Sequence, residues 1–355
     1  MADATKITAA LTELHTRYAT LNEGKLADYI PELTNVDPNL FSIAATTVEG
    51  DVCAVGDHGA TFTIQSVSKP FTFGHALDTR GREQVLGRVG VEPTGDAFNS
   101  IIKLDAANRP HNPCVNSGAI AVTSLLHEAD ATASVKNLLD SFNRFAGRTL
   151  NVDLPVFTSE RSHGHRNRAI AYLMLHFGMI EGRVDAILDL YFQQCAIQVN
   201  CTDLATMAAT LANGGTNPVT GEQAMDSGYV RDVLTVMQTC GMYDYSGRWA
   251  YTVGLPAKSG ISGGILAVLP GKMGIACYSP LVDAYGHSVR GVRVFEDLSS
   301  EFGLHLFDAA RGPMSAARDE AFKKRTDEAV PAALTDTPKA YTPDRGRAPD
   351  HKDSD

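Results

Sequence analysis

The chain has 355 residues, 44% hydrophobic and 20% charged, which is an ordinary globular composition with room for one large domain or two lobes. Its formal net charge of −10 argues against a general nucleic-acid binder and against an anionic membrane surface as partner. From residue 311 onward there are nine basic and nine acidic residues, so the net charge lies wholly in residues 1–310.

The N-terminal stretch shows the spacing of a surface helix, with Ile7, Leu11, Leu14 and Tyr18 on one side. It lacks the unbroken apolar run of a signal peptide, and no segment approaches transmembrane length. Six cysteines are scattered without a C-x-x-C pair, which favours buried thiols in a reducing compartment over disulfides or a zinc site. We therefore expect a cytoplasmic protein.

Strands are predicted at both ends of the globular part, and helices between them. Strand character occurs at 41–48, 52–55 and 62–64, and it returns at 251–255, 264–268 and 273–278. Helical periodicity dominates the middle of the chain and a last segment at about 288–302. The predicted helices of the middle part cover residues 119–127, 135–145, 169–177, 184–195, 202–212 and 229–239.

This order predicts an α/β chain of the α+β type: one antiparallel sheet assembled from both ends, flanked by terminal helices, with an inserted all-helical lobe. We expect the sheet lobe over about 1–92 and 250–310, the helical lobe over about 93–249, and a ligand cleft between them. Beyond Gly312 the chain holds five of its sixteen prolines and few large apolar residues. We predict a disordered tail over 311–355, with at most a short helix at 314–328.

Ser66 and Lys69 stand where the third strand gives way to a helical segment. Residues at i and i+3 share a helix face, so the hydroxyl and the amine can meet. Burial, cationic neighbours and the field of a helix N-terminus lower the pKa of a lysine, and a neutral lysine can take the proton of a nucleophilic serine. The alternative is an N-cap serine beside a solvated lysine. The pattern alone is weak, since Ser100 and Lys103 repeat it, and there we interpret Lys103 as a surface lysine.

A second element is Lys258 in the sequence Lys-Ser-Gly, placed on an edge strand just before a glycine-rich turn. Lys-Ser/Thr-Gly on an edge strand is the partner element of S-x-x-K acyl-transfer enzymes, and its backbone can supply one oxyanion donor. An isolated lysine on an edge strand more often prevents aggregation. Together with Ser66, the catalytic interpretation is favoured.

These two elements belong to a longer series of motifs that resembles the serine-dependent, β-lactamase-like glutaminase family. The resemblance extends from about residue 26 to residue 307. The motifs are ADYIPEL (27–33), QSVSK (65–69), FNSI (98–101), NPCVNSGAI (112–120), SE (159–160), RN (166–167), YFQQC (191–195), GMYD (241–244), GLPAKSG (254–260) and SGGI (262–265).

The resemblance implies a β-lactamase/penicillin-binding-like fold and hydrolysis of L-glutamine to glutamate and ammonia through a γ-glutamyl-serine, without cofactor or metal. It also implies a homodimer or homotetramer. The implied catalytic residues are Ser66 as nucleophile, Lys69 as its base, and Tyr191, Tyr243 and Lys258. The implied ligands of glutamine are Tyr29, Ser66, Asn116, Glu160, Asn167, Tyr191, Tyr243 and the backbone of Ile261. The family usually has valine where Ile261 stands, a change that leaves the backbone N–H in place.

The polar residues among these suit an α-amino acid. Glu160 can pair with the α-ammonium group, although the polar stretch 159–167, broken by Gly164, is also typical of a surface loop. Asn116 and Asn167 can donate to the α-carboxylate without adding charge, or they can serve as turn or cap residues.

The tyrosines leave different alternatives open. Tyr191 lies on the apolar face of a predicted helix, where packing in the core with one satisfied hydroxyl is the alternative. Tyr29 and Tyr243 lie in loop-like segments, where functional residues concentrate. Ammonia can be protonated as it leaves by Lys69, Tyr191 or Tyr243.

Three other functions compete with glutamine hydrolysis. A penicillin-recognising hydrolase shares the fold and the S-x-x-K motif, but it acts outside the inner membrane and needs an export signal or anchor. A non-catalytic amino-acid-binding protein would not need Ser66, Lys69 and Lys258 together. A metal hydrolase would draw on the eleven histidines, of which only His163 and His165 form a close pair, without H-E-x-x-H character.

Overall fold

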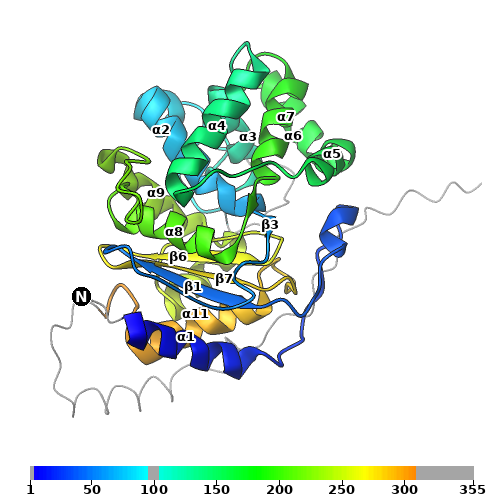
Figure 1. Cartoon of the computed structure of the whole chain (residues 1–355). Coiled ribbons are helices and arrows are strands. Elements are labelled where there is room, and N and C mark those ends of the chain that lie inside the picture. Colours follow the sequence, from blue (N-terminus) through cyan, green and yellow to red (C-terminus); the bar gives the residue numbers. More distant parts are fainter. Residues whose placement is uncertain (1–3, 95–103, 309–355) are drawn as a thin grey trace, which may run out of the picture.

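The computed structural model describes residues 4–94 and 104–308. Figure 1 shows a sheet with helices beneath it and a layer of helices above it. Predictions for Ser100, Lys103, the 98–101 motif and the tail over 311–355 lie outside the described residues.

The central sheet has the strand order β2 (Val52–Gly56), β1 (Ser42–Thr47), β7 (Met273–Tyr278), β6 (Gly264–Leu269) and β5 (Ala257–Ser259). All neighbouring strands are antiparallel. β1 pairs with β7 from Ser42 opposite Tyr278 to Thr47 opposite Met273, so the two ends of the chain meet in the middle of the sheet. The predicted antiparallel sheet assembled from both ends is confirmed.

Both faces of this sheet are covered by helices. Beneath it lie α1 (Ala4–Tyr18) and α11 (Val289–Phe302), joined by an ion pair of 2.6 Å between Arg17 and Asp297 (Figure 1). α8 (Cys201–Ala212) packs on the other face, against β7, β1 and β6. A Cβ at Gly274 of β7 would lie 2.1 Å from the backbone nitrogen of Ala209 in α8, so this close approach requires a glycine.

The remaining helices form the upper layer. They are α2 (Lys69–Leu86), α3 (Asn116–Leu126), α4 (Ala131–Ala146), α5 (Leu154–His163), α6 (His165–His176), α7 (Val184–Cys195) and α9 (Ser227–Cys240). The exception is α10 (Ser246–Thr252), whose Trp249 packs on Phe295 of α11 in the core beneath the sheet. The six helices predicted in the middle of the chain are all present, and α7 has the predicted bounds. Throughout 4–94 and 104–308, no helix combines the length and apolar character needed to cross a bilayer.

One local prediction is wrong, and one alternative interpretation is excluded. The strand predicted at 251–255 is replaced by α10, which extends to Thr252. The stretch 159–167 is not a surface loop but the end of α5 and the start of α6. α5 begins where the side chain of Asp153 accepts a hydrogen bond from the backbone N–H of Val156, with proline in the first turn. The Asp-x-Pro pattern at residues 153–155 is a signal for the start of a helix, so the sequence does contain an indication of α5.

The short strand β3 (Phe62–Thr63) also differs from expectation. It does not join the central sheet, and pairs instead with β4 (Gln198–Val199), which precedes α8. The ring of Phe62 stacks on Tyr278 of β7 at 3.8 Å between centroids, which holds this small ribbon against the main sheet. The chain then enters the turn that contains Ser66.

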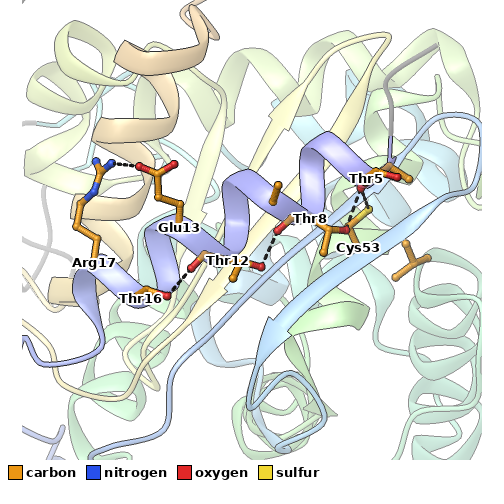
Figure 2. Close-up of a pocket in the computed structure, with 10 residues that line it drawn as sticks. Thr5, Thr8, Thr12, Glu13, Thr16, Arg17 and Cys53 are labelled. Atoms are coloured by element: carbon orange, nitrogen blue, oxygen red, sulfur yellow. Dashed lines mark hydrogen bonds and ion pairs between the residues drawn. The ribbon is translucent and has the colours of Figure 1, made fainter.

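Figure 2 shows a hollow along the outer side of α1, next to Cys53 of the edge strand β2. The hydroxyls of Thr8, Thr12 and Thr16 donate to carbonyls one turn earlier in the same helix, at 2.8–2.9 Å. Their hydrogen-bonding capacity is therefore largely used within α1. This hollow lies on the α1 side of the sheet, opposite the helices that carry the predicted site (Figure 1).

Candidate functional site

Ser66 lies in the 3-10 turn η2 (Gln65–Ser68) directly before α2, and not within the first turn of the helix itself. Every other residue from 62 to 74 is buried, whereas Ser66 is partly exposed. Gln65 has a φ of +49°, which is rare for a residue with a side chain. The hydroxyl of Ser68 donates to the Gln65 carbonyl at 2.6 Å and accepts from Gln194 at 2.9 Å, which pins the turn.

Lys69 begins α2 and is 1% exposed, so it is not the solvated lysine of the alternative interpretation. Its amine donates to Oδ1 of Asn116 at 2.6 Å, and Nδ2 of Asn116 donates to Oδ1 of Asn167 at 3.1 Å. Burial lowers the pKa of Lys69 to about 8. A substantial fraction of this amine is therefore neutral near pH 8 and able to accept a proton.

Lys258 lies on the edge strand β5, as predicted, and is fully buried. Its amine donates to the carbonyl of Ser259 at 2.7 Å and lies 3.9 Å from the centre of the Tyr243 ring. The amine of Lys69 lies 5.7 Å from the same ring. Burial and the charge of Lys69 lower the pKa of Lys258 well below its ordinary value. Two desolvated amines thus share one aromatic ring.

Tyr243 links these amines to the serine. Its hydroxyl and that of Ser66 are hydrogen-bonded to each other, and burial raises the pKa of Tyr243 above its ordinary value. The phenol is therefore protonated at neutral pH and can act as a proton donor at Ser66. Tyr243 opens the 3-10 turn η3 (Tyr243–Tyr245) with a φ of +56°, a strained conformation for a tyrosine.

A second polar group surrounds Glu160, which is 3% exposed at the inner side of α5. The hydroxyl of Tyr29 donates to Glu160 and lies 2.9 Å from Oε1 of Gln65. Burial raises the pKa of Glu160 to about 7, while hydrogen bonds from Tyr29 and Gln65 and the charge of Lys69 oppose the shift. A buried carboxylate of this kind favours a cationic ligand, which would lower its pKa again.

The structure also places the last two predicted ligands. Tyr191 is 2% exposed on α7 and is hydrogen-bonded to the Cys195 thiol, and burial raises its pKa well above the ordinary value. Ile261 is partly buried and packs against the cluster that contains Ala27 and Ile30. The preceding Gly260 is so close to the nucleophile turn that a Cβ there would lie 3.0 Å from the Ile64 carbonyl. The backbone after β5 therefore lies directly beside Ser66.

Sequence reasoning missed three residues at this site. Gln65 supports both Tyr29 and Glu160, and Cys195 contacts Tyr191. Both stand inside the motifs QSVSK and YFQQC, but no pattern assigns them a contact. His287 lies parallel to Tyr243 and belongs to no motif that we recognised.

Comparisons with known proteins agree with this arrangement. Residues 24–307 match the family model described as Glutaminase. The chain belongs to the glutaminase family. It is 59% identical to a glutaminase of Trichormus variabilis over 85% of this chain and 90% of that protein. A solved probable glutaminase is 40% identical and superimposes with a TM-score of 0.83, covering 86% of this chain and 99% of its own.

A further solved structure is that of Mglu in its glutamate form. It is 42% identical, with a TM-score of 0.82, and the match covers 85% of this chain and 70% of that one. Family membership confirms the predicted fold class, the β-lactamase-like arrangement of an antiparallel sheet and helices. It also confirms the predicted enzyme class, a hydrolase of the glutaminase type.

Proposed function

We propose that this glutaminase hydrolyses L-glutamine to L-glutamate and ammonia, with the γ-glutamyl group held on Ser66 as an ester. The observation that supports this most directly is the surroundings of Ser66. Its hydroxyl bonds to Tyr243, whose ring lies beside the two buried amines of Lys69 and Lys258. Such amines provide a base near neutral pH without a histidine.

The substrate is held at both ends in this proposal. Glu160, supported by Tyr29 and Gln65, receives the α-ammonium group, and Asn116 and Asn167 bind the α-carboxylate. Tyr191 borders the glutamine chain. The side-chain amide then reaches Ser66, where the N–H groups of Ser66 and Ile261 bind its oxygen. The related Mglu was solved in its glutamate form, and glutamate is the product assigned here.

The reaction is a double displacement. Oγ of Ser66 bonds to the amide carbon while Lys69 takes the hydroxyl proton, and the carbonyl π electrons move to the oxyanion. The carbon–nitrogen bond then breaks, and the nitrogen gains a proton from Lys69 or Tyr243 and leaves as ammonia. Water adds to the ester carbon while its proton goes to the base. The carbonyl then re-forms, the Ser66–carbon bond breaks as the base returns that proton to Oγ of Ser66, and glutamate is released. The oxyanion donors alone typically contribute about 10²–10³ in rate.

Ser66→Ala tests this mechanism, with Ser300→Ala on the exposed side of α11 as its matched control. Ammonia and glutamate release from glutamine should fall by at least about 10³-fold in Ser66→Ala, because the nucleophile is lost. Ser300→Ala should behave as wild type, and calorimetry should still detect glutamine binding to Ser66→Ala. Ammonia release at the wild-type rate by Ser66→Ala would rule out the ester intermediate.

We also propose that the protein acts in the cytoplasm as a homodimer or homotetramer. Six free, buried thiols support a reducing compartment, since none of them is used in a disulfide. Light scattering of the purified chain and fractionation of its host cells test these two points. A monomer at micromolar concentration, or recovery outside the cytoplasm, would contradict them.

A further inference from the structure

His287 is a fully buried histidine directly before the N-cap of α11. Neither ring nitrogen makes a hydrogen bond of good geometry to a described residue, and the polar group that acts on the ring is the backbone of Met242. Burying a polar ring without hydrogen-bond partners costs stability, so a residue of this kind calls for an explanation. The proposed reaction does not use it as acid, base or ligand.

The imidazole is wedged among three tyrosine rings. It lies parallel to Tyr243, with an interplanar angle of 3° and 6.1 Å between centroids. Tyr245 meets it edge-on at 5.5 Å, and Tyr285 lies 6.3 Å away. The three tyrosine rings therefore pack around the side chain of His287.

Tyr243 needs such support. Its φ of +56° is unfavourable for a residue with a Cβ, and it persists only where the surroundings enforce it. The same side chain bonds to Ser66 and lies against the amine of Lys258. A small tilt of this ring would move both contacts, and misplacement by 1 Å can cost about 10² in rate.

Asp283 fixes the position of His287. Oδ1 of Asp283 accepts from the backbone N–H of His287 at 3.0 Å and from that of Tyr285 at 2.9 Å. The backbone N–H of Asp283 donates to the His287 carbonyl at 2.8 Å. These hydrogen bonds fix the backbone of the turn 283–287, and with it the position from which the imidazole extends.

The ring is also uncharged. Burial and the positive charge of Lys258 lower the pKa of His287 to about 3, against the opposing effect of the Met242 backbone. A neutral ring adds no positive charge beside Lys258, which is itself fully buried. What His287 offers Tyr243 is thus flat surface rather than charge.

We propose that His287 is a positioning residue whose neutral ring holds Tyr243 against Ser66 and Lys258 and excludes water from the Lys258 amine. This inference rests on the proposed function, because it takes Tyr243 and Lys258 as parts of the reaction centre. The side chain acts through Tyr243 and touches neither substrate nor product.

The test compares His287→Phe, which keeps a flat ring, with His287→Ala, which removes it. His287→Phe should keep kcat within about threefold of wild type, since packing of aromatic faces is retained. His287→Ala should lower kcat by about 100-fold with little change in KM, because Tyr243 is misplaced while Glu160 and Asn116 are untouched. His287→Leu, which fills space without a flat face, replaces the alanine variant if that variant fails to fold.

The pH profile adds a measurement that a purely structural role would not move. The ionisable groups near Lys258 are Lys69, Cys114, Tyr243 and His287. Water admitted by His287→Ala reduces the desolvation of Lys258 and raises its pKa, so that Lys258 holds a proton more readily. This charge lowers the pKa of Lys69, the proposed base, so the acid limb of kcat should shift downward by about one pH unit. His58→Ala, at an exposed histidine, is the matched control and should leave both kcat and the profile unchanged.

Two results would overturn the inference. If His287→Phe were as inactive as His287→Ala, a ring nitrogen would be required and flat surface would not suffice. If His287→Ala kept the wild-type kcat and pH profile, no positioning would take place. Failure of the proposed function is distinguishable from both, because wild-type protein would then release no ammonia from glutamine.

Discussion

The amine of Lys69 donates a hydrogen bond to Oδ1 of Asn116 across 2.6 Å, which joins the predicted base directly to a predicted ligand of the substrate carboxylate. Asn116 in turn donates to Asn167. This chain of contacts couples the protonation of the base to the group that holds the substrate. A change at Asn116 should therefore alter the pH dependence of the reaction as well as its affinity.

Asn116→Asp places a carboxylate beside the Lys69 amine without changing the shape of the side chain. An opposite charge at this distance should raise the pKa of Lys69 by about 1–3 units. The acid limb of kcat should move upward accordingly, and KM should rise because the substrate carboxylate is repelled. Asn116→Ala is the control: it should raise KM without this upward shift. An unchanged profile in Asn116→Asp would show that Lys69 is not the base.

The wild-type enzyme should lose kcat/KM as the pH falls through two steps. Lys69, with a pKa of about 8, must be neutral, and this form is lost below pH 8. Glu160, with a pKa of about 7, must be charged, and this form is lost below pH 7. Log kcat/KM should approach a slope of two below about pH 6.5 and reach its maximum at about pH 8.5. At higher pH it should fall again, because the α-ammonium group of glutamine loses its proton. Glu160→Gln should remove one step and raise KM.

Lys69→Met should make the protein more stable while abolishing activity. The folded-state pKa of Lys69 is lowered from 10.5 to about 8, so the unfolded chain binds this proton more tightly. The resulting cost is present in full below pH 8, disappears above pH 10.5, and amounts to about 3 kcal/mol. Loss of the bond to Asn116 offsets part of it. Urea unfolding at pH 7 should show a gain of about 1–3 kcal/mol that fades by pH 10.5.

Arg290→Met should destabilise the protein and weaken substrate binding together. Arg290 is 1% exposed and donates to the carbonyls of Ala19, Leu21 and Asn39. These contacts fasten both ends of the segment that contains Tyr29. Leaving the carbonyls without a donor should cost about 3 kcal/mol or more. Urea unfolding and KM for glutamine check both effects. Arg293→Met, on the same helix, is the control and should change KM little.

The sequence predicted the regular part of this fold well. α7 (Val184–Cys195) and β7 (Met273–Tyr278) have the predicted bounds because a clear apolar period and a Pro-Gly turn mark them. α10 was mistaken for a strand because Tyr251, Thr252 and Val253 favour strands locally. The helix is instead stabilised through Trp249, whose indole N–H donates to the Leu255 carbonyl at 2.8 Å and whose ring packs on Phe295. Such a tertiary contact leaves no local pattern.

The residues of the candidate site also fall into two groups, those that the sequence indicated and those that it did not. Ser66, Lys69 and Lys258 could be proposed from the sequence because the chemistry expected of them requires particular residue types within short motifs. The roles of Gln65 and His287 depend on a φ of +49° and on a wedge between aromatic rings. Both the φ of Gln65 and the packing of His287 arise from contacts between residues far apart in the sequence. Residue spacing along the chain therefore cannot predict them.

The pairing of β1 with β7 has a consequence for synthesis of the protein. Ser42 faces Tyr278, so the middle of the sheet stays open until nearly the whole catalytic chain has left the ribosome. Before then β1 and β2 can form only a hairpin with α1 on one face, and two-stranded units of this kind are marginally stable in water. The helices made in between have no completed sheet to pack on. The nascent chain therefore exposes apolar surface through most of translation, which makes this a protein that should depend on chaperones during synthesis.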